Sequence, residues 1–100
     1  MDIAYSVNGV PIRLTEERWE HIVSNKPYMG SYYEKVLEAI ENPIWILRGY
    51  AGAIVAVLFI ARRNYLHVVY REVSPDDGFI ITAFLSTKVN RRTIIWPRRY

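Results

Sequence analysis

A histidine and an arginine one helical turn apart are the residues of this chain best suited to chemistry near neutral pH. Histidine is the side-chain type that most readily accepts or donates a proton near neutral pH, so His21 is a candidate general acid or base. Arg18 lies three residues earlier, on the same flank of a predicted helix. Its guanidinium can bind a phosphate through two hydrogen bonds and oppose charge that develops on it. The pair therefore predicts acid–base chemistry at a phosphate, and the alternative is an ordinary solvated helix face.

Three residues of predicted strands are further candidates. His67 alternates with apolar residues, which is more typical of a half-buried structural histidine than of a catalyst. Arg71 falls on the same strand face as His67, near the end of that strand. Thr82 is the polar residue of the apolar segment 79–85, and its hydroxyl either binds a phosphate oxygen or reflects β-propensity alone. The loop 74–78 does not determine whether Arg71 and Thr82 share a face, because that depends on the strand register.

The composition excludes most other chemistry. The chain has no cysteine, so disulfides and thiolate metal sites are excluded. Its two histidines have no carboxylate at a spacing that would complete a metal site, and there is neither a glycine-rich phosphate loop nor a nucleophile elbow. We therefore expect no metal and no cofactor, and metal-free acid–base chemistry remains.

The charge is unevenly distributed along the chain. Residues 1–42 contain four basic and seven acidic side chains, whereas residues 43–100 contain nine basic and three acidic ones. A basic half of this kind predicts a polyanionic partner such as RNA, and the alternative is a solvated surface with a basic tail. The predicted RNA-binding residues are Arg62, Arg63, Lys88, Arg91 and Arg92. Tyr28, Tyr32 and Tyr50, near predicted loops, either stack on bases or fill half-buried positions.

The predicted elements place these residues in a small α+β domain. Asn8-Gly9 is a strong turn signal and predicts an N-terminal strand or hairpin over residues 3–14. Helices are expected from Thr15 to Pro27 and from Ser31 to Asn42, because apolar residues recur there at helical spacing. The strands expected after them are 44–48, 53–61, 65–73, 79–86 and a short 94–96. We expect one domain over residues 1–100, with both helices packed on one face of a twisted antiparallel sheet and a basic C-terminal tail over residues 88–100.

The longest apolar segment, residues 53–61, has nine residues, whereas a membrane-spanning helix needs about 20. The N-terminus does not have the pattern of a signal peptide. We therefore expect a cytoplasmic protein without a membrane partner.

Several sequence segments together resemble segments of one protein family. Ile12–Ile22 resembles the opening of small prokaryotic and phage proteins of the barnase–EndoU–colicin–RelE nuclease superfamily. Tyr65–Arg71 and Gly78–Leu85 resemble later strand phrases of that family, and the tail from Arg91-Arg92 to Trp96-Pro97 also fits. The similarity extends over nearly the whole chain in the right order, although no single phrase is decisive.

The resemblance implies two helices against an antiparallel sheet in a RelE/barnase-like arrangement. It also implies metal-independent RNA cleavage, often by a toxin that an antitoxin or immunity protein holds. Carried over to this chain, His21 is the general acid or base, Arg18 and Arg71 hold the scissile phosphate, and Thr82 donates a hydrogen bond to it.

The chain departs from the family pattern at three places. Lys26-Pro27-Tyr28 stands where related sequences often have His-Pro-Glu, Arg71 replaces a lysine, and Phe84 replaces a tyrosine. The first departure motivates an alternative function, an RNA-binding module of the same fold without catalysis. A third function is a protein-interaction subunit, which would dock through the basic tail or through the acidic residues Glu34, Glu38 and Glu41.

Overall fold

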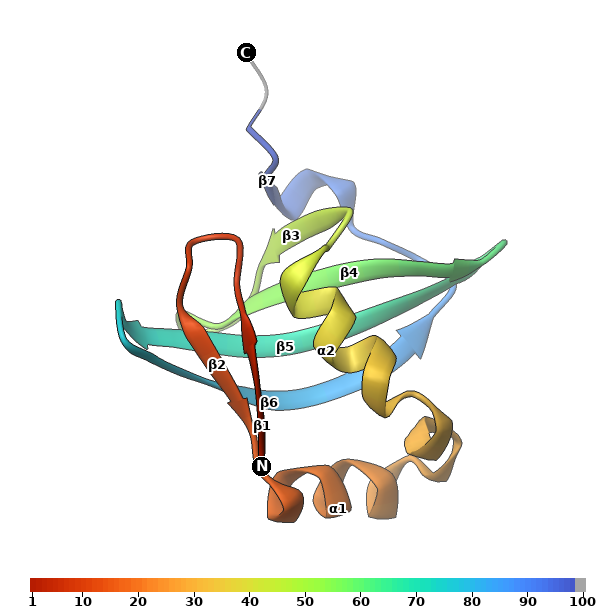
Figure 1. The fold of residues 1–100 in the computed structure, drawn as a ribbon. Helices are drawn as coiled ribbons and strands as arrows, with labels where there is room; N and C mark the ends of the chain where they lie inside the picture. The colour runs from red at the N-terminus through yellow and green to blue at the C-terminus, as the bar shows by residue number, and fades with distance from the viewer. Residues whose placement is uncertain (99–100) are drawn as a thin grey trace.

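Seven strands form one mixed sheet in the order β1-β2-β6-β5-β4-β3-β7, and two α-helices accompany it (Figure 1). The computed structural model describes residues 1–98, so Arg99 and Tyr100 of the predicted basic tail lie outside the described residues. The strands are β1 (Asp2–Tyr5), β2 (Pro11–Leu14), β3 (Trp45–Arg48), β4 (Ile54–Ala61), β5 (Asn64–Ser74), β6 (Asp77–Ser86) and β7 (Ile94–Trp96). The helices are α1 (Glu16–Asn25) and α2 (Tyr33–Glu41), with short 3-10 turns η1 (Pro27–Ser31) and η2 (Arg91–Thr93). The chain is therefore α+β.

The expectation of a wholly antiparallel sheet is wrong at one junction. β2 pairs with β6 in parallel, with Ile12 beside Gly78 and Arg13 beside Phe79. The predicted N-terminal hairpin of β1 and β2 is present. The residues of the hairpin do not indicate which other strand of the sheet pairs with it. Gly78 allows the close approach, because a Cβ there would lie 2.5 Å from Cδ1 of Ile12. An ion pair of 2.9 Å between Arg13 Nε and Asp77 Oδ1 reinforces the junction.

Helix α1 begins where the sequence predicts. The Thr15 side chain accepts a hydrogen bond of 3.1 Å from the backbone N–H of Arg18, which caps the first turn. Two acidic residues occupy that turn, where the helix dipole favours negative charge. Ile22 is fully buried, and the Trp19 ring packs edge-on against Tyr33 at 5.0 Å between centroids. The predicted apolar stripe therefore faces the core.

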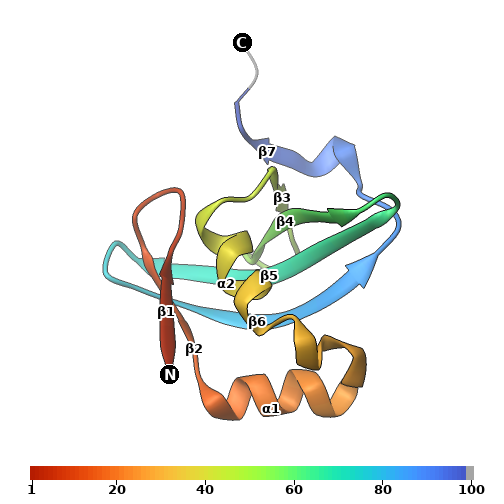
Figure 2. The same cartoon turned by 45° about the vertical axis from the view of Figure 1, so that its right-hand side comes forward.

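The two helices differ in how they meet the sheet. α2 buries Val36, Ala39 and Ile40 and crosses one face, where it contacts β1, β4 and β5 (Figure 2). α1 instead lies alongside β6, at the border of the sheet (Figures 1 and 2). The pairing of β2 with β6 stops at Phe79, and α1 starts directly after β2, so the helix continues along the edge of β6. The expectation that both helices cover one face is met by α2 alone.

The core lies between α2, α1 and the inner face of the sheet. Its fully buried side chains include Leu66, Val68 and Tyr70 of β5. The intervening residues His67, Val69 and Arg71 face the other side of the sheet, which we call the outer face, because side chains alternate along a strand. Within residues 1–98, no helix is long and apolar enough to cross a membrane.

Candidate nucleic-acid interface

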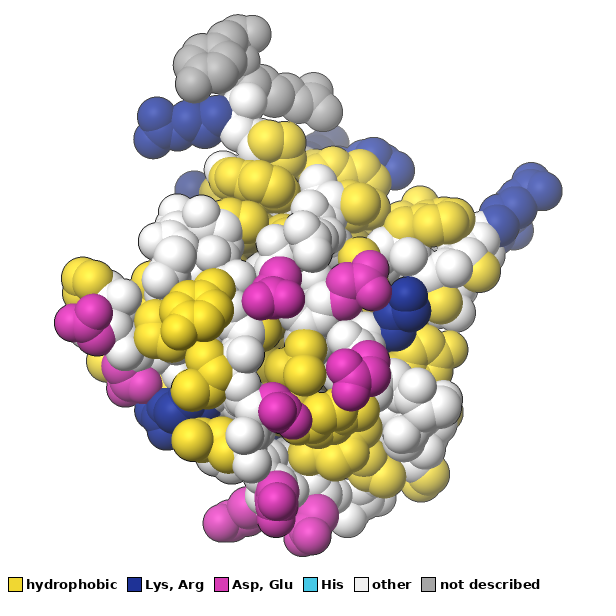
Figure 3. Space-filling model, in the orientation of Figure 1, with side chains coloured by type: hydrophobic (Ala, Val, Ile, Leu, Met, Phe, Trp, Pro, Cys, Tyr) yellow, Lys and Arg dark blue, Asp and Glu magenta, His cyan; other side chains and the backbone are white. Residues whose placement is uncertain are grey.

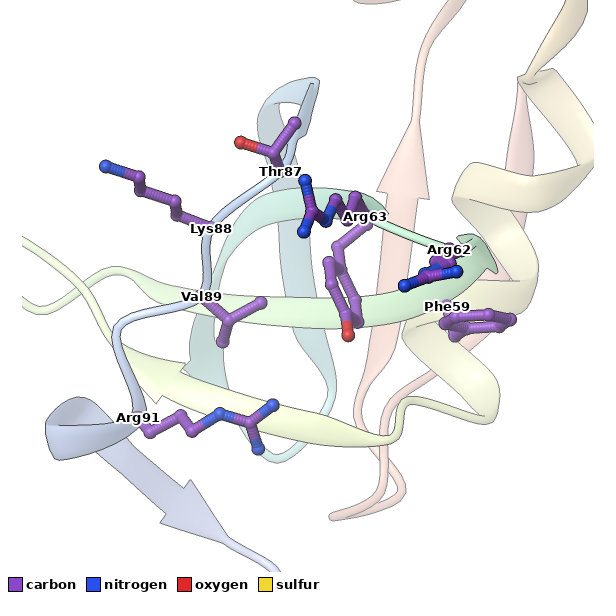
Figure 4. Close-up of a pocket in the computed structure, with 8 residues that line it drawn as sticks. Phe59, Arg62, Arg63, Thr87, Lys88, Val89 and Arg91 are labelled. Atoms are coloured by element: carbon purple, nitrogen blue, oxygen red, sulfur yellow. The ribbon is translucent and has the colours of Figure 1, made fainter.

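Four of the five predicted RNA-binding cations meet around one hollow of about 500 Å³, which we call the basic hollow. Arg62 and Arg63 come from the turn between β4 and β5, whereas Lys88 and Arg91 come from the segment after β6 (Figure 4). The remaining lining residues are Phe59, Tyr65, Thr87 and Val89. No acidic side chain is among these described residues, so the hollow presents only positive formal charge.

The turn between β4 and β5 explains why two arginines project together. Ala61 pairs with Asn64, so Arg62 and Arg63 form a two-residue hairpin turn. Arg63 has a φ of 58°, a left-handed conformation that residues other than glycine adopt only uncommonly. Both side chains are exposed at the tip of the β4–β5 hairpin, where they can reach a ligand.

Aromatic rings form one wall of the basic hollow. The rings of Phe59 and Tyr65 meet edge-on at 5.8 Å, and Tyr65 lies 6.1 Å from the ring of Trp45. The guanidinium of Arg91 sits over the Trp45 ring at 4.5 Å from its centroid, which fixes this cation beside the wall. Phe59 keeps 52% of its surface exposed, so apolar ring surface is available next to the cations.

The fifth predicted cation lies apart. Arg92 is not among the residues that line the basic hollow, and instead lines an adjacent depression together with Arg91 and Arg98. The Asn90 side chain accepts a hydrogen bond of 3.2 Å from the backbone N–H of Arg92 and thereby caps η2. Arg91 thus belongs to both depressions and joins them.

The two catalytic candidates of α1 share a separate hollow. Arg18 and His21 line a space of about 490 Å³ together with Thr15 and Glu17. His21 is exposed, and its Nε2 lies 3.2 Å from the amide nitrogen of Asn25. An accessible imidazole beside a guanidinium can exchange a proton with a bound ligand and hold its phosphate.

The structure answers the register question for Arg71 and Thr82. Thr82 pairs with Val69, two residues before Arg71, so both candidates lie on the outer face. Their contacts nevertheless differ. Arg71 Nη2 donates a hydrogen bond of 2.7 Å to the backbone oxygen of Ala51, which ties it to the loop between β3 and β4. Arg71 is thus engaged by the protein itself, whereas Thr82 binds a second cation.

That second cation is Lys26, a residue not predicted to be functional from the sequence. Its Nζ donates a hydrogen bond of 3.1 Å to Thr82 Oγ1. Lys26 is the C-cap of α1, and the edge position of α1 lets its side chain reach the outer face. The signal in the sequence was Lys26-Pro27, which places a cation directly at the predicted end of the helix.

His67 has a structural environment. It is 5% exposed, its ring stacks on Phe84 at 4.9 Å, and its Nδ1 donates a hydrogen bond of 3.2 Å to the backbone oxygen of Tyr65. Burial lowers the pKa of His67, so the ring is neutral near pH 7. Among the described residues no three carboxylate or imidazole side chains are grouped to hold a metal.

Comparisons of this chain with known proteins gave no match. No family model matches the sequence, and neither a curated protein nor a solved structure does so.

Proposed function

We propose that this chain is a metal-independent ribonuclease that holds RNA in the basic hollow. The observation that carries the proposal is the convergence of Arg62, Arg63, Lys88 and Arg91 beside exposed aromatic surface. Clustered cations bind phosphates, and aromatic rings bind unpaired bases. The proposal includes the RelE/barnase-like type of fold, which the order of helices and strands and the resembling phrases support.

In the proposed reaction the ribose 2′-oxygen attacks the adjacent phosphorus, and the bond from phosphorus to the 5′-oxygen breaks. A base takes the 2′-proton, and an acid returns a proton to the leaving 5′-oxygen. His21 fits one of these roles, because its ring is exposed and lies beside Arg18, which can oppose the charge on the phosphate. Lys26 and Thr82 offer a further cation and hydroxyl to a phosphate oxygen.

The test is RNA cleavage by the purified chain in EDTA, with single-stranded and transfer RNA as substrates. Wild type should cleave, and His21→Ala should lose activity while still binding RNA. Ser24→Ala is a matched control, because Ser24 is exposed on the same helix and does not line the hollow that contains Arg18 and His21. Intact RNA at high wild-type concentration, or full activity of His21→Ala, would contradict the proposal.

RNA binding without cleavage is the second candidate function. It is favoured by the contact of Arg71 with Ala51 and by the absence of a histidine among the residues described around the basic hollow. Binding through four cations predicts a logarithmic salt slope of about −3 for single strands, or roughly 50-fold weaker binding at 200 mM than at 50 mM salt. Such binding with no cleavage would select this function.

A toxin role with an antitoxin or immunity protein as partner belongs to the same proposal. A nuclease that acts on cellular RNA should arrest growth when it is expressed alone. Wild type should therefore reduce colony formation, and His21→Ala should restore it at equal protein level. Equal growth arrest by both proteins would separate toxicity from the proposed chemistry.

A further inference from the structure

We infer that the basic hollow is a stacking site for one unpaired base of single-stranded RNA. The inference rests on the proposed function and specifies the form of RNA that the chain binds. Its starting point is Phe59, whose ring is 52% exposed in the wall of a hollow formed by cations. A charged ligand alone would not need this apolar surface, whereas a nucleotide has both a phosphate and a flat ring.

The aromatic wall of the basic hollow presents the ring face of Phe59, and a neighbouring ring limits the movement of that side chain. Tyr65 packs edge-on against Phe59 at 5.8 Å and supports the ring from the side. The register of β4 and β5 places Phe59 directly opposite Tyr65, so the two rings are fixed by the sheet. A base that stacks on Phe59 therefore meets a ring that is already positioned, and little side-chain entropy is lost on binding.

The cations that line the hollow with this ring come from two segments of the chain. Arg62 and Arg63 come from the β4–β5 turn, and Lys88 and Arg91 come from the strand-to-turn segment that follows β6 (Figure 4). A strand of RNA that lies across the hollow can place phosphates against both segments while one base enters between them. The volume of about 500 Å³ is in the range of sites for small ligands, which suits one nucleotide.

Bases of a duplex cannot use such a wall, because each base face is already stacked on its neighbours inside the helix. Sequence-independent binding of single strands typically combines a cationic groove with exposed aromatic rings. An acidic protein segment would satisfy the cations but would leave the Phe59 face unused. The combination of ring and cations therefore favours a single-stranded nucleic acid over an acidic partner at this site.

The experiment measures binding by fluorescence anisotropy with a labelled ten-nucleotide oligoadenylate. The probe is 2′-O-methylated, which removes the attacking hydroxyl and prevents cleavage. Wild type should bind this single strand more tightly than its duplex with a complementary strand. It should also bind it more tightly than an oligomer of equal charge with abasic sugars, because one stacked base contributes about 5- to 100-fold in affinity.

Two substitutions of Phe59 measure the contribution of its aromatic ring to binding. Phe59→Leu should weaken binding of the single strand by about 5- to 100-fold and leave duplex binding unchanged, whereas Phe59→Trp should preserve binding. Tyr5→Leu is the matched control, because Tyr5 is 58% exposed on β1 and does not line the hollow. The affinity of this control variant for the single strand should equal that of wild type. Urea unfolding curves should show that every variant keeps the fold.

The outcomes distinguish the inference from the function on which it rests. Equal affinity for the single strand, the duplex and the abasic oligomer would overturn the stacking site and leave RNA binding intact. Unchanged affinity of Phe59→Leu would do the same. Displacement of the RNA by polyglutamate at equal charge concentration would assign the hollow to an acidic partner instead. Absence of binding to every probe would overturn both proposals.

Discussion

The substitution Gly78→Ala tests the parallel junction between β2 and β6, on which the fold depends. A Cβ on Gly78 would lie 2.5 Å from Ile12 Cδ1 and 2.6 Å from the backbone oxygen of Arg71. The first atom can move, but the second belongs to the neighbouring strand. Overpacking of this kind costs about 1–3 kcal/mol, and the reduced freedom of the unfolded chain returns about 0.4–1 kcal/mol. We therefore expect the free energy of unfolding to fall by about 1–2 kcal/mol.

Urea unfolding followed by tryptophan fluorescence measures this change. With a urea dependence of about 1–3 kcal/mol per molar for a small domain, the midpoint should fall by about 1 M at an unchanged slope. Gly30→Ala is the control, because a Cβ on Gly30 would have its nearest neighbour at 3.9 Å, an ordinary contact. Its midpoint should stay at or slightly above that of wild type.

The double variant Ile12→Val/Gly78→Ala shows whether the contact itself causes the loss. Ile12→Val removes Cδ1, so the two changes should couple by at least about 0.5 kcal/mol in the double-mutant cycle. A Gly78→Ala protein as stable as wild type would refute the close approach of β2 to β6. Additive effects would instead assign the cost to the Arg71 backbone.

The remaining predictions concern single side chains. Tyr70→Phe should raise the free energy of unfolding by about 1 kcal/mol in the same titration, because the buried Tyr70 hydroxyl has no hydrogen-bond partner among the described residues. Burial lowers the pKa of His67, so the unfolded chain binds a proton at a higher pH than the folded chain does. The free energy of unfolding should therefore be at its full value above the unfolded pKa of about 6.5 and decrease below it. His67→Phe should lose this decrease in urea titrations at pH 7 and pH 5. Lys26→Gln should keep the fold, weaken RNA binding and reduce the logarithmic salt slope by about 0.7, whereas an unchanged slope would exclude a phosphate contact at Lys26.

Local signals predicted most of the elements because those signals act within a few residues. Asn8 and Gly9 lie in the loop that joins the two strands of the predicted hairpin, with a φ of 77° at Gly9, and Thr15 caps α1 as expected. Both depend on backbone preferences that neighbouring residues satisfy. The apolar segment 53–61 likewise gave β4, one of the central strands of the sheet.

Long-range pairing was not predictable in the same way. The parallel neighbour of β2 follows from how the whole chain closes around the core, and the glycine at position 78 that permits it has no distinct local pattern. The edge position of α1 has the same origin, and with it the reach of Lys26 to Thr82. The convergence of the Arg62-Arg63 turn with Lys88 also depends on strand register, although charge alone had marked each residue.

The distribution of charge on the surface indicates from which side a polyanion would approach the proposed interface. The acidic residues Glu34 and Glu38 of α2 are exposed, and Figure 3 shows acidic side chains gathered on the face that α2 covers. Arg62 and Arg63 stand at the far end of the β4–β5 hairpin, beside a hollow lined by cations and neutral residues. A polyanion would be repelled by the first surface and attracted by the second, so this charge distribution would orient the proposed RNA ligand toward the basic hollow. The net charge of +3 understates this effect, because Glu34 and Glu38 lie on α2 whereas the cations of the basic hollow lie on other elements.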